Sequence, residues 1–355
     1  MAQVDAYDVS GDVDYDKLIK EFGAKLIDDK LAKKLDYPLV PNLYFAHRDL
    51  DTIIKKKFAI ITGRGPSMNM HLGHMILWKF MKHLQDKFDA HVFIPFSDDE
   101  KLLARGLSKE HVIRMDYENL LDIIAMGYDP KKTEIMLDLV NMKQEVYNLA
   151  IEISSHMTAN TIRSAMGFSP ESTIGLQFYP AMQAAHILYP SQKLGVPTLV
   201  PIGVDQDVFV KLTRDVAEKV GLPKPGDIMS KFLPGLTGNK MSSSKPETAI
   251  FTTDNYKTVK KKIMNAFTGG RPTVEEHRRL GCETSVCVVC KYQALLFQDL
   301  DIVKRCAKGE VLSGENKKDL LEKVWSMLEL HQEKREKAKD QVKKFVPELS
   351  DYEPK

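Results

Sequence analysis

The residues with the clearest chemical potential lie in the stretch TGRGPSMNMHLGH, residues 62–74, directly behind the apolar run FAII. Its glycines let backbone amide groups approach a ligand closely, and a helix starting behind them would point its positive end at the same ligand. His71 and His74 are three residues apart, so both imidazoles fall on one face of the helix start and can hydrogen-bond to one phosphate group. The stretch predicts an anion site, with a surface turn that happens to hold histidines as the alternative.

A second stretch, GLTGNKMSSSKPE at residues 235–247, is a loop rich in glycine and serine. It carries Lys240 and the hydroxyls of Ser242, Ser243 and Ser244. A lysine with several hydroxyls on a mobile loop suits a pyrophosphate leaving group, because the departing charge must be neutralised and then released. The alternative is a disordered linker. Together with residues 62–74, this loop favours nucleotidyl transfer.

The elements that must position these two stretches follow from the apolar pattern. The short apolar runs FAIIT, HVFIPF, TEIMLDL and TLVPIGV alternate with helical patterns at residues 74–87, 108–126, 143–157 and 207–220. Such alternation is typical of a parallel sheet covered by helices on both faces, in which ligands bind at the carboxyl ends of the strands. The expected fold class is therefore α/β, with a doubly wound, Rossmann-like catalytic domain.

Three regions are expected along the chain. Residues 1–56 hold an amphipathic segment and a Pro-rich link and are expected to form an appended helical segment, while residues 57–253 form the catalytic domain. After residue 254 the strand signals stop, so residues 254–355 are expected to form an all-helical C-terminal domain. The last long helix has an apolar stripe only along its first half, which predicts a solvated second half.

Composition bounds the class of protein. The chain has 355 residues with 43% hydrophobic content, and its 51 Lys and Arg nearly balance 49 Asp and Glu, so net charge does not indicate a nucleic-acid partner. No run approaches the roughly 18 apolar residues of a membrane span, and the acidic opening does not resemble an export signal. We therefore expect a cytoplasmic protein without a membrane partner.

The four cysteines raise the possibility of a metal site, because Cys287 and Cys290 form a C-x-x-C with Cys282 and His277 just upstream. A second C-x-x-C is missing, and a closed zinc site usually needs four ligands. The run SVCVVCKYQALLF is typical of the start of an apolar helix, where cysteine acts as a small buried hydrophobe. Buried reduced thiols are the favoured interpretation, and no metal ligand is assigned.

The two glycine-rich stretches resemble the H-[I/L]-G-H and K-M-S-x-S signatures of class I aminoacyl-tRNA synthetases. The segments TGRGPS, MHLGHM, DDEK, PAMQAA, GVDQD, KLTRDVA and KMSSS occur in the order and spacing of the tryptophanyl-tRNA synthetases of archaeal and eukaryotic type. The resemblance runs from Tyr15 to about residue 345. It implies a two-step reaction, in which the amino-acid carboxylate attacks the α-phosphate of ATP and the acyl group then moves to the terminal ribose of tRNA.

The resemblance also implies which residues serve each substrate. Phosphate contacts are implied for Arg64, His71, His74, Lys101, Lys240, Ser242, Ser243 and Ser244, of which the histidines, Lys240 and the serines are the expected catalytic residues. Gly65 and Met241 are expected among the residues that bind ATP. Gly203 and Asp205 match the ATP-binding positions, and Mg²⁺ is expected with the pyrophosphate. The polar contacts to the substrate α-amino group fall on Glu100, Gln183 and Gln206.

The side-chain pocket departs from the family pattern. Ile61 and Pro95, beside Gly63, stand where family members hold the indole N–H with a tyrosine and a glutamine. Burying that donor without an acceptor costs about 1–3 kcal/mol. Three explanations remain open: a backbone carbonyl or His91 replaces the acceptor, the pocket accepts another apolar amino acid, or the chain no longer charges tRNA. The resemblance further implies a homodimer and an anticodon-binding role for the helical C-terminal domain.

Overall fold

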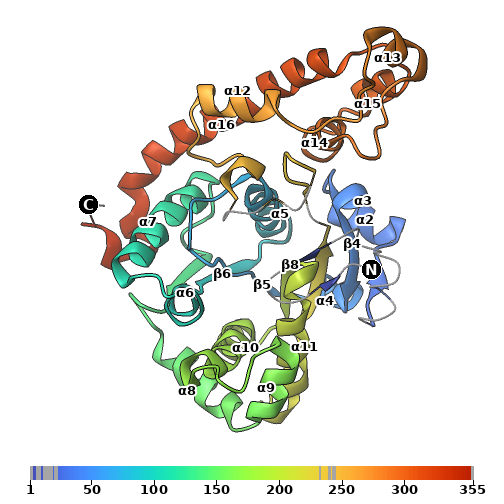
Figure 1. Ribbon diagram of the computed structural model, residues 1–355. Coiled ribbons are helices and arrows are strands. Elements are labelled where there is room, and N and C mark those ends of the chain that lie inside the picture. The colour runs from blue at the N-terminus through green and yellow to red at the C-terminus, as the bar shows by residue number, and fades with distance from the viewer. Residues whose placement is uncertain are drawn as a thin grey trace.

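The computed structural model describes residues 3–4, 9–10, 19, 23–231, 233–238, 241 and 245–352. Figure 1 shows a central sheet flanked by helices, with a helical C-terminal part that arches over one side of it. Among the helices of these described residues, none combines the length and apolarity needed to cross a bilayer.

A seven-stranded sheet organises the molecule, in the order β3-β4-β9-β8-β5-β6-β7. The strands from β9 to β7 are parallel to one another, and β4 pairs antiparallel with both β9 and β3. The strands of this sheet are β3 Lys25–Leu26, β4 Tyr44–Arg48, β5 Ala59–Ile61, β6 His91–Phe96, β7 Thr133–Leu137, β8 Thr198–Gly203 and β9 Gly226–Ser230. A separate two-stranded pair joins β1 Gln3–Val4 to β2 Val9–Ser10.

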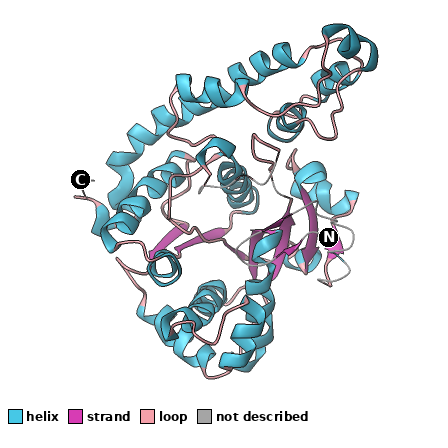
Figure 2. Cartoon of the chain, viewed as in Figure 1, coloured by secondary structure: helices cyan, strands magenta, loops and turns pink. Residues whose placement is uncertain are grey.

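Helices cover both faces of the sheet, as Figure 2 shows in cyan around magenta strands. The helices that follow the chain through the sheet region are α2 Asp29–Leu35, α3 Val40–Leu43, α4 Leu50–Ile53, α5 Leu72–Phe88, α6 Asp98–Arg105, α7 Lys109–Ala125, α8 Gln144–Ser154, α9 Ala159–Met166, α10 Ile174–Leu194 and α11 Asp207–Ala217. The C-terminal helices are α12 Tyr256–Met264, α13 Val274–Leu280, α14 Val288–Leu296, α15 Leu300–Ala307, α16 Ser313–Ala338 and α17 Val342–Phe345. Short 3₁₀ turns occur at η1 Val204–Gln206, η2 Glu218–Val220, η3 Pro246–Thr248, η4 Lys339–Gln341 and η5 Pro347–Leu349.

Alternate residues of each central strand pack against the helices on the two opposite faces of the sheet. Ile60 belongs to the apolar cluster with α5 and α7, whereas Ile61 packs in the cluster with α8, α10 and α11. Along β6, Ile94 and Phe93 divide in the same way. Because successive side chains of a strand point to opposite faces, a strand buried on both sides reads as a continuous apolar run. This is the pattern from which the sequence predicted strands.

The doubly wound fold and the helical C-terminal part are confirmed. Each of the four predicted apolar runs contains a strand, and each predicted helical stretch overlaps one of α5, α7, α8 and α11. Sequence analysis missed β9 and β4, which carry only five residues each. The segment expected as a helical arm therefore contributes β3 and β4 to the sheet, and Arg48 of β4 donates through Nη1 to Asp207 Oδ1 at 2.6 Å and to Asp227 Oδ2 at 2.5 Å.

The second half of α16 has a buried stripe in addition to the expected solvated face. His331 and Arg335 are buried, and α16 packs along α7 on the sheet side (Figure 1). The expected solvated face is present at Glu333, Lys334, Glu336 and Lys337, but counting charge without periodicity missed the buried stripe beside it. Charged side chains with long apolar stems can be buried once partners satisfy their polar ends.

Candidate active site

The glycine-rich stretch continues the pairing of β5 with β6 past the end of both strands. Arg64 N donates to Pro95 O at 2.9 Å, and Ser97 N donates to Arg64 O at 2.9 Å. These bonds fix the backbone between β5 and α5 at the carboxyl edge of the sheet. This is the edge at which doubly wound folds bind ligands.

The Arg64 guanidinium is buried, and hydrogen bonds to a side chain of α7 and to a backbone carbonyl hold it in place. Its Nε donates to Asn119 Oδ1 of α7 at 2.8 Å, and its Nη2 donates to Met68 O at 3.0 Å. Burial lowers the pKa of Arg64 to about 10, so the side chain remains a cation at neutral pH. Its remaining nitrogen, Nη1, lies 3.3 Å from His74 Nε2.

The two histidines form one unit at the start of α5. Their rings stack with centroids 3.7 Å apart, and His71 N donates to His74 Nδ1 at 3.2 Å. Burial, together with the charge of Arg64 and the neighbouring His71, holds the pKa of His74 well below its usual range. A neutral imidazole that accepts at Nδ1 carries its proton on Nε2. Arginine only donates, so the 3.3 Å contact with Arg64 Nη1 requires Nε2 to accept, and a neutral His74 can satisfy only one of the two contacts at a time. A phosphate group that takes the Arg64 Nη1 hydrogen would leave Nε2 to donate to it as well.

The segment around the lysine and serine loop adjoins these histidines. Leu72 N donates to Ile250 O at 3.0 Å and Thr252 N donates to Met70 O at 2.9 Å. A Cβ added at Gly73 would lie 3.5 Å from Met241 Sδ. The predicted positions Lys240, Ser242, Ser243 and Ser244 lie outside the described residues.

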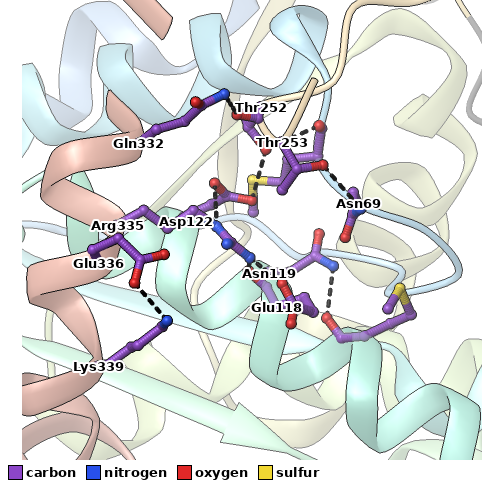
Figure 3. Close-up of polar contacts among 12 residues, drawn as sticks. Asn69, Glu118, Asn119, Asp122, Thr252, Thr253, Gln332, Arg335, Glu336 and Lys339 are labelled. Atoms are coloured by element: carbon purple, nitrogen blue, oxygen red, sulfur yellow. Dashed lines mark hydrogen bonds and ion pairs between the residues drawn. The ribbon is translucent and has the colours of Figure 1, made fainter. Parts of the chain in front are cut away.

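A buried polar network connects this corner to the C-terminal helix (Figure 3). Asp122 of α7 accepts from Thr252 Oγ1 at 3.0 Å and contacts His331 Nε2 of α16 at 2.8 Å. Gln332 of α16 donates through Nε2 to Thr252 O at 2.8 Å. The residues beside the histidines are thus clamped between α7 and α16. Sequence analysis missed this clamp because its members are far apart along the chain.

Lys101 and Glu100 lie at the start of α6 beside the glycine turn. A Cβ at Gly65 would lie 2.5 Å from Lys101 Cε, so a larger residue at position 65 would displace the end of the lysine side chain. The Lys101 ammonium pairs with Glu100 Oε2. Glu100 is buried, and its Oε1 has no hydrogen-bond partner among the described residues. The pair thus presents one cation and one unoccupied carboxylate oxygen at the site.

The predicted amino-acid pocket gathers around Gly63. A Cβ at Gly63 would lie 3.2 Å from Pro95 O and 3.9 Å from Gln183 Nε2, so three predicted positions converge there. Gln183 Oε1 accepts from Tyr179 OH at 3.1 Å and from Ser97 Oγ at 3.5 Å, which fixes the orientation of the amide. Ile61 is buried in the apolar cluster beneath this pocket.

The remaining predicted residues follow β8. Gly203 ends this strand, and Asp205 and Gln206 form the next turn, η1. Because β8 is the neighbour of β5 in the sheet, this turn lies at the same edge as the glycine stretch. His91 is at the opposite edge, exposed at the amino end of β6, so it is excluded as a replacement acceptor for an indole N–H.

His186 is a buried polar residue that sequence analysis did not single out. It lies one helical turn after Gln183 on α10, and its Nε2 is 3.0 Å from Asp138 Oδ1 at the end of β7. His186 Nδ1 has no partner among the described residues. Asp138 and Asp99 raise the pKa of His186 against the effect of its burial. A histidine in an otherwise apolar stretch, three residues after a candidate ligand residue, was the available signal.

Carboxyl groups surround that pair. Asp98 Oδ1 accepts from Asp138 N at 3.0 Å and its Oδ2 accepts from Leu139 N at 2.9 Å, which joins α6 to β7. Burial and the neighbouring carboxyls raise the pKa of Asp98 to about 6, that of Asp99 to about 8 and that of Asp116 to about 10. Asp116 is therefore protonated at neutral pH.

The arrangement places nitrogen groups at one corner of the carboxyl edge of a doubly wound sheet, with the predicted amino-acid positions Gly63, Pro95 and Gln183 beside them. The family model for class I tRNA synthetases (W and Y) matches residues 54–329. The chain belongs to this family of tRNA synthetases.

Relatives and solved structures agree with that assignment. The chain is 42% identical to the tryptophan–tRNA ligase of Pyrobaculum calidifontis over 96% of both chains. It is also 42% identical to that of Thermococcus sibiricus, covering 97% of this chain and 94% of the relative. The tryptophanyl-tRNA synthetase of Aeropyrum pernix matches with a TM-score of 0.85 at 32% identity, over 92% and 94% of the chains. That of Encephalitozoon cuniculi, bound to tryptophan, matches at 0.84 and 32% identity, over 96% and 99%.

Proposed function

We propose that this protein is a tryptophan–tRNA ligase, which activates tryptophan with ATP and transfers it to tRNA. The proposal rests mainly on Arg64 Nη1 and His74 Nε2, which lie 3.3 Å from each other at the edge of a doubly wound sheet. Tryptophan–tRNA ligases at about 42% identity over almost the whole chain support the substrate. The two alternatives of altered specificity and lost charging are not favoured.

The phosphates of ATP bind at the corner formed by Arg64, His71 and His74. The tryptophan carboxylate attacks the α-phosphorus, and the bond from that phosphorus to the pyrophosphate oxygen breaks. Donors fixed before the reaction stabilise the charge that develops on the phosphates without reorganising. We assign Lys101 and the predicted loop residues Lys240 and Ser242 to Ser244 to the same task, and Gly203 and Asp205 to the remainder of ATP.

Mg²⁺ is expected to arrive with ATP. The groups at the phosphate corner are nitrogen donors, whereas Mg²⁺ takes oxygen ligands. The donor set therefore fits a metal held by phosphate oxygens and water. Its chemistry would be to neutralise charge on the departing pyrophosphate.

The tryptophan α-ammonium binds to Glu100 Oε1, with Gln183 and Gln206 as further acceptors. Glu100 Oε1 is buried without a partner among the described residues, and a carboxylate left so is costly unless a cation meets it. The Lys101 ammonium on Oε2 can remain in place when the substrate binds.

The indole N–H donates to His186 Nδ1 in place of the family's usual acceptors. Because Nε2 faces Asp138, a neutral His186 carries its proton there and has a lone pair on Nδ1. Protonation would remove that lone pair. The KM for tryptophan should therefore fall as pH rises through the raised pKa of His186, whose neighbours include Asp98, Asp99 and Asp138.

ATP–pyrophosphate exchange over a panel of amino acids tests the reaction and its substrate. We expect exchange with tryptophan alone, followed by charging of tryptophan tRNA. Exchange with another amino acid in preference to tryptophan, or ATP binding with no exchange, would contradict the proposal.

A leucine at position 186 tests the indole contact. Loss of a hydrogen-bond acceptor costs about 1–3 kcal/mol, so His186→Leu should raise the KM for tryptophan by about 5- to 150-fold and weaken rejection of phenylalanine. His186→Asn keeps an acceptor and should recover part of the loss. His83→Leu, which removes a histidine bonded to Leu35 O away from the site, is the control. An unchanged KM in a folded His186→Leu variant would rule out the contact.

We also propose a homodimer that acts on tRNA in the cytoplasm. Tyr147 and Ile151 are exposed apolar residues four apart on α8, which supports an interface there. Lys257, Lys260 and Lys261 are exposed on α12, where they can meet tRNA phosphates. Light scattering should give twice the chain mass, and Ile151→Glu should give the monomer.

A further inference from the structure

The four cysteines meet in the helical part farthest from the sheet. We name residues 269–312, which include α13, α14 and α15, the tip; Figure 1 shows it at the far end of α16. The sulfurs of Cys282, Cys287 and Cys290 all lie within 4.8 Å of one another. The Cys290 thiol also interacts with that of Cys306. Four thiols from three segments, the loop after α13, the start of α14 and the end of α15, thus form one cluster.

Each thiol is buried, and each is unoxidised. Cys287, Cys290 and Cys306 are 1% exposed and Cys282 is 8% exposed, and the structure holds all four as free cysteines. The expected burial of the thiols is confirmed. The candidate metal ligands considered from the sequence did not include Cys306, because 15 residues separate it from Cys290 and no C-x-x-C marks it.

Hydrogen-bond donors are directed at the sulfurs. Asn316 of α16 is buried, and its Nδ2 donates to Cys306 Sγ at 3.1 Å and to Cys290 Sγ at 3.6 Å. The backbone N–H groups of Cys290 and Gly269 hydrogen-bond to the Cys287 sulfur. A neutral thiol is a weak acceptor, whereas a thiolate bound to a metal is a strong one, and such donors are typical of the shell around metal–thiolate sites.

We propose that Cys282, Cys287, Cys290 and Cys306 bind one Zn²⁺ ion that holds the tip together. Zinc–sulfur bonds of about 2.3 Å at tetrahedral angles separate the sulfurs by about 3.8 Å, which three sulfurs within 4.8 Å reach by small side-chain rotations. An iron–sulfur cluster would place several irons and sulfides between the thiolates, and so needs a wider cradle. Four thiolates and a closed, buried position are typical of structural zinc.

The surrounding charge and backbone suit this ion. Four thiolates and Zn²⁺ carry a net charge of two negatives, and Lys317 of α16 lies near Cys287 and Arg305 of α15 near Cys306. The backbone segments that carry Cys282 and Cys306 are bonded to each other, because Cys282 N donates to Cys306 O at 2.9 Å. A Cβ at Gly281, whose φ is +71°, would lie 1.8 Å from Ala307 O. A metal that crosslinks three segments of the chain adds to the stability of the fold that it holds.

Metal analysis of the purified full-length protein is the direct test. We expect about one zinc and no iron per chain, and after exchange with Co²⁺ we expect the sulfur-to-cobalt charge-transfer bands and intense visible bands of a tetrahedral thiolate site. Cys290→Ser and Cys306→Ser should each lower the zinc content. Val289→Ala, which changes a buried neighbour and keeps all four thiols, should retain it.

Hydrogen exchange measured with and without zinc keeps the test independent of the variants. Removing zinc with a mercurial and a chelator should remove protection from the tip amides, including that of Cys282, while β5 and β6 keep theirs and ATP–pyrophosphate exchange continues. A chain that takes up neither Zn²⁺ nor Co²⁺ under reducing conditions overturns the proposal. So does the finding of bound iron with sulfide, or of a disulfide between any two of these cysteines.

Discussion

Replacing Arg64 by lysine isolates the geometry of the phosphate corner from its charge. Lysine keeps the positive charge and loses the planar fork that donates to Asn119 and to Met68 O. Met68 O keeps a donor, because Asn119 Nδ2 also reaches it at 3.1 Å. Asn119 Oδ1 loses its donor inside the protein, which should destabilise the fold by about 1–3 kcal/mol.

The catalytic effect should be larger than the effect on stability. Arg64 Nη1 and His74 Nε2 act together only if both are held in place, and lysine is not held by α7. Loss of one fixed donor to a developing negative charge lowers kcat by about 10²- to 10³-fold. We therefore expect kcat for ATP–pyrophosphate exchange to fall by that factor, with a smaller change in the KM for tryptophan.

The assay is exchange kinetics together with a thermal unfolding curve. Arg278→Lys is the matched control, because Arg278 Nη1 also donates to backbone carbonyls, those of Gly309 and Glu310, but in the tip. This control should leave exchange unchanged. Exchange by folded Arg64→Lys within threefold of the parent would refute the role of the guanidinium.

Three further variants test other parts of the fold. The pKa of Asp116 is raised to about 10, so the native state binds the proton more tightly than the unfolded chain, and the free energy of unfolding falls as pH rises above about 4. Between pH 6 and 9 the Tm of Asp116→Asn should therefore fall less than that of the parent. Equal falls in Tm for the two proteins would contradict this. Arg48→Met leaves the buried Asp227 carboxylate without its cation, whereas Asp207 keeps its ion pair with Lys211; the variant should cost about 3–5 kcal/mol in urea unfolding, and a loss below 1 kcal/mol would show that the Arg48 ion pairs are dispensable. Gly65→Ala displaces only the flexible end of Lys101, so the Tm should stay unchanged while the KM for ATP rises. A KM for ATP equal to that of the parent would show that Lys101 does not contribute to ATP binding.

Much of the candidate site was predictable because its parts are local in the sequence. Residues 62–74 contain the end of β5, the glycine turn and both histidines of the α5 start. The spacing of apolar residues likewise predicted β5, β6, β7 and β8. Lys101 and Glu100, Gln183, and the turn after β8 were found from resemblance to family motifs. Their place at the same edge follows from the parallel sheet.

Other features depend on contacts between distant residues. The pairing of β4 with β9 joins residues about 180 apart, and β9 is too short to show a period. The burial of His331 in the C-terminal helix depends on Asp122, and the burial of His186 in α10 depends on Asp138. A polar side chain is buried when a partner satisfies it, and the partner is chosen by the fold.

The sequence by itself determined the alternation of strands and helices, the phosphate corner and the family, because each of these is written in periodicity or in residues close together along the chain. Only the tertiary structure decided that Cys306 joins the other three cysteines and that His186 Nδ1 has no partner among the described residues. The physical reason is that a ligand set or a buried acceptor is a property of distances in space, and loops and helices of the chain fix those distances only after the core has packed.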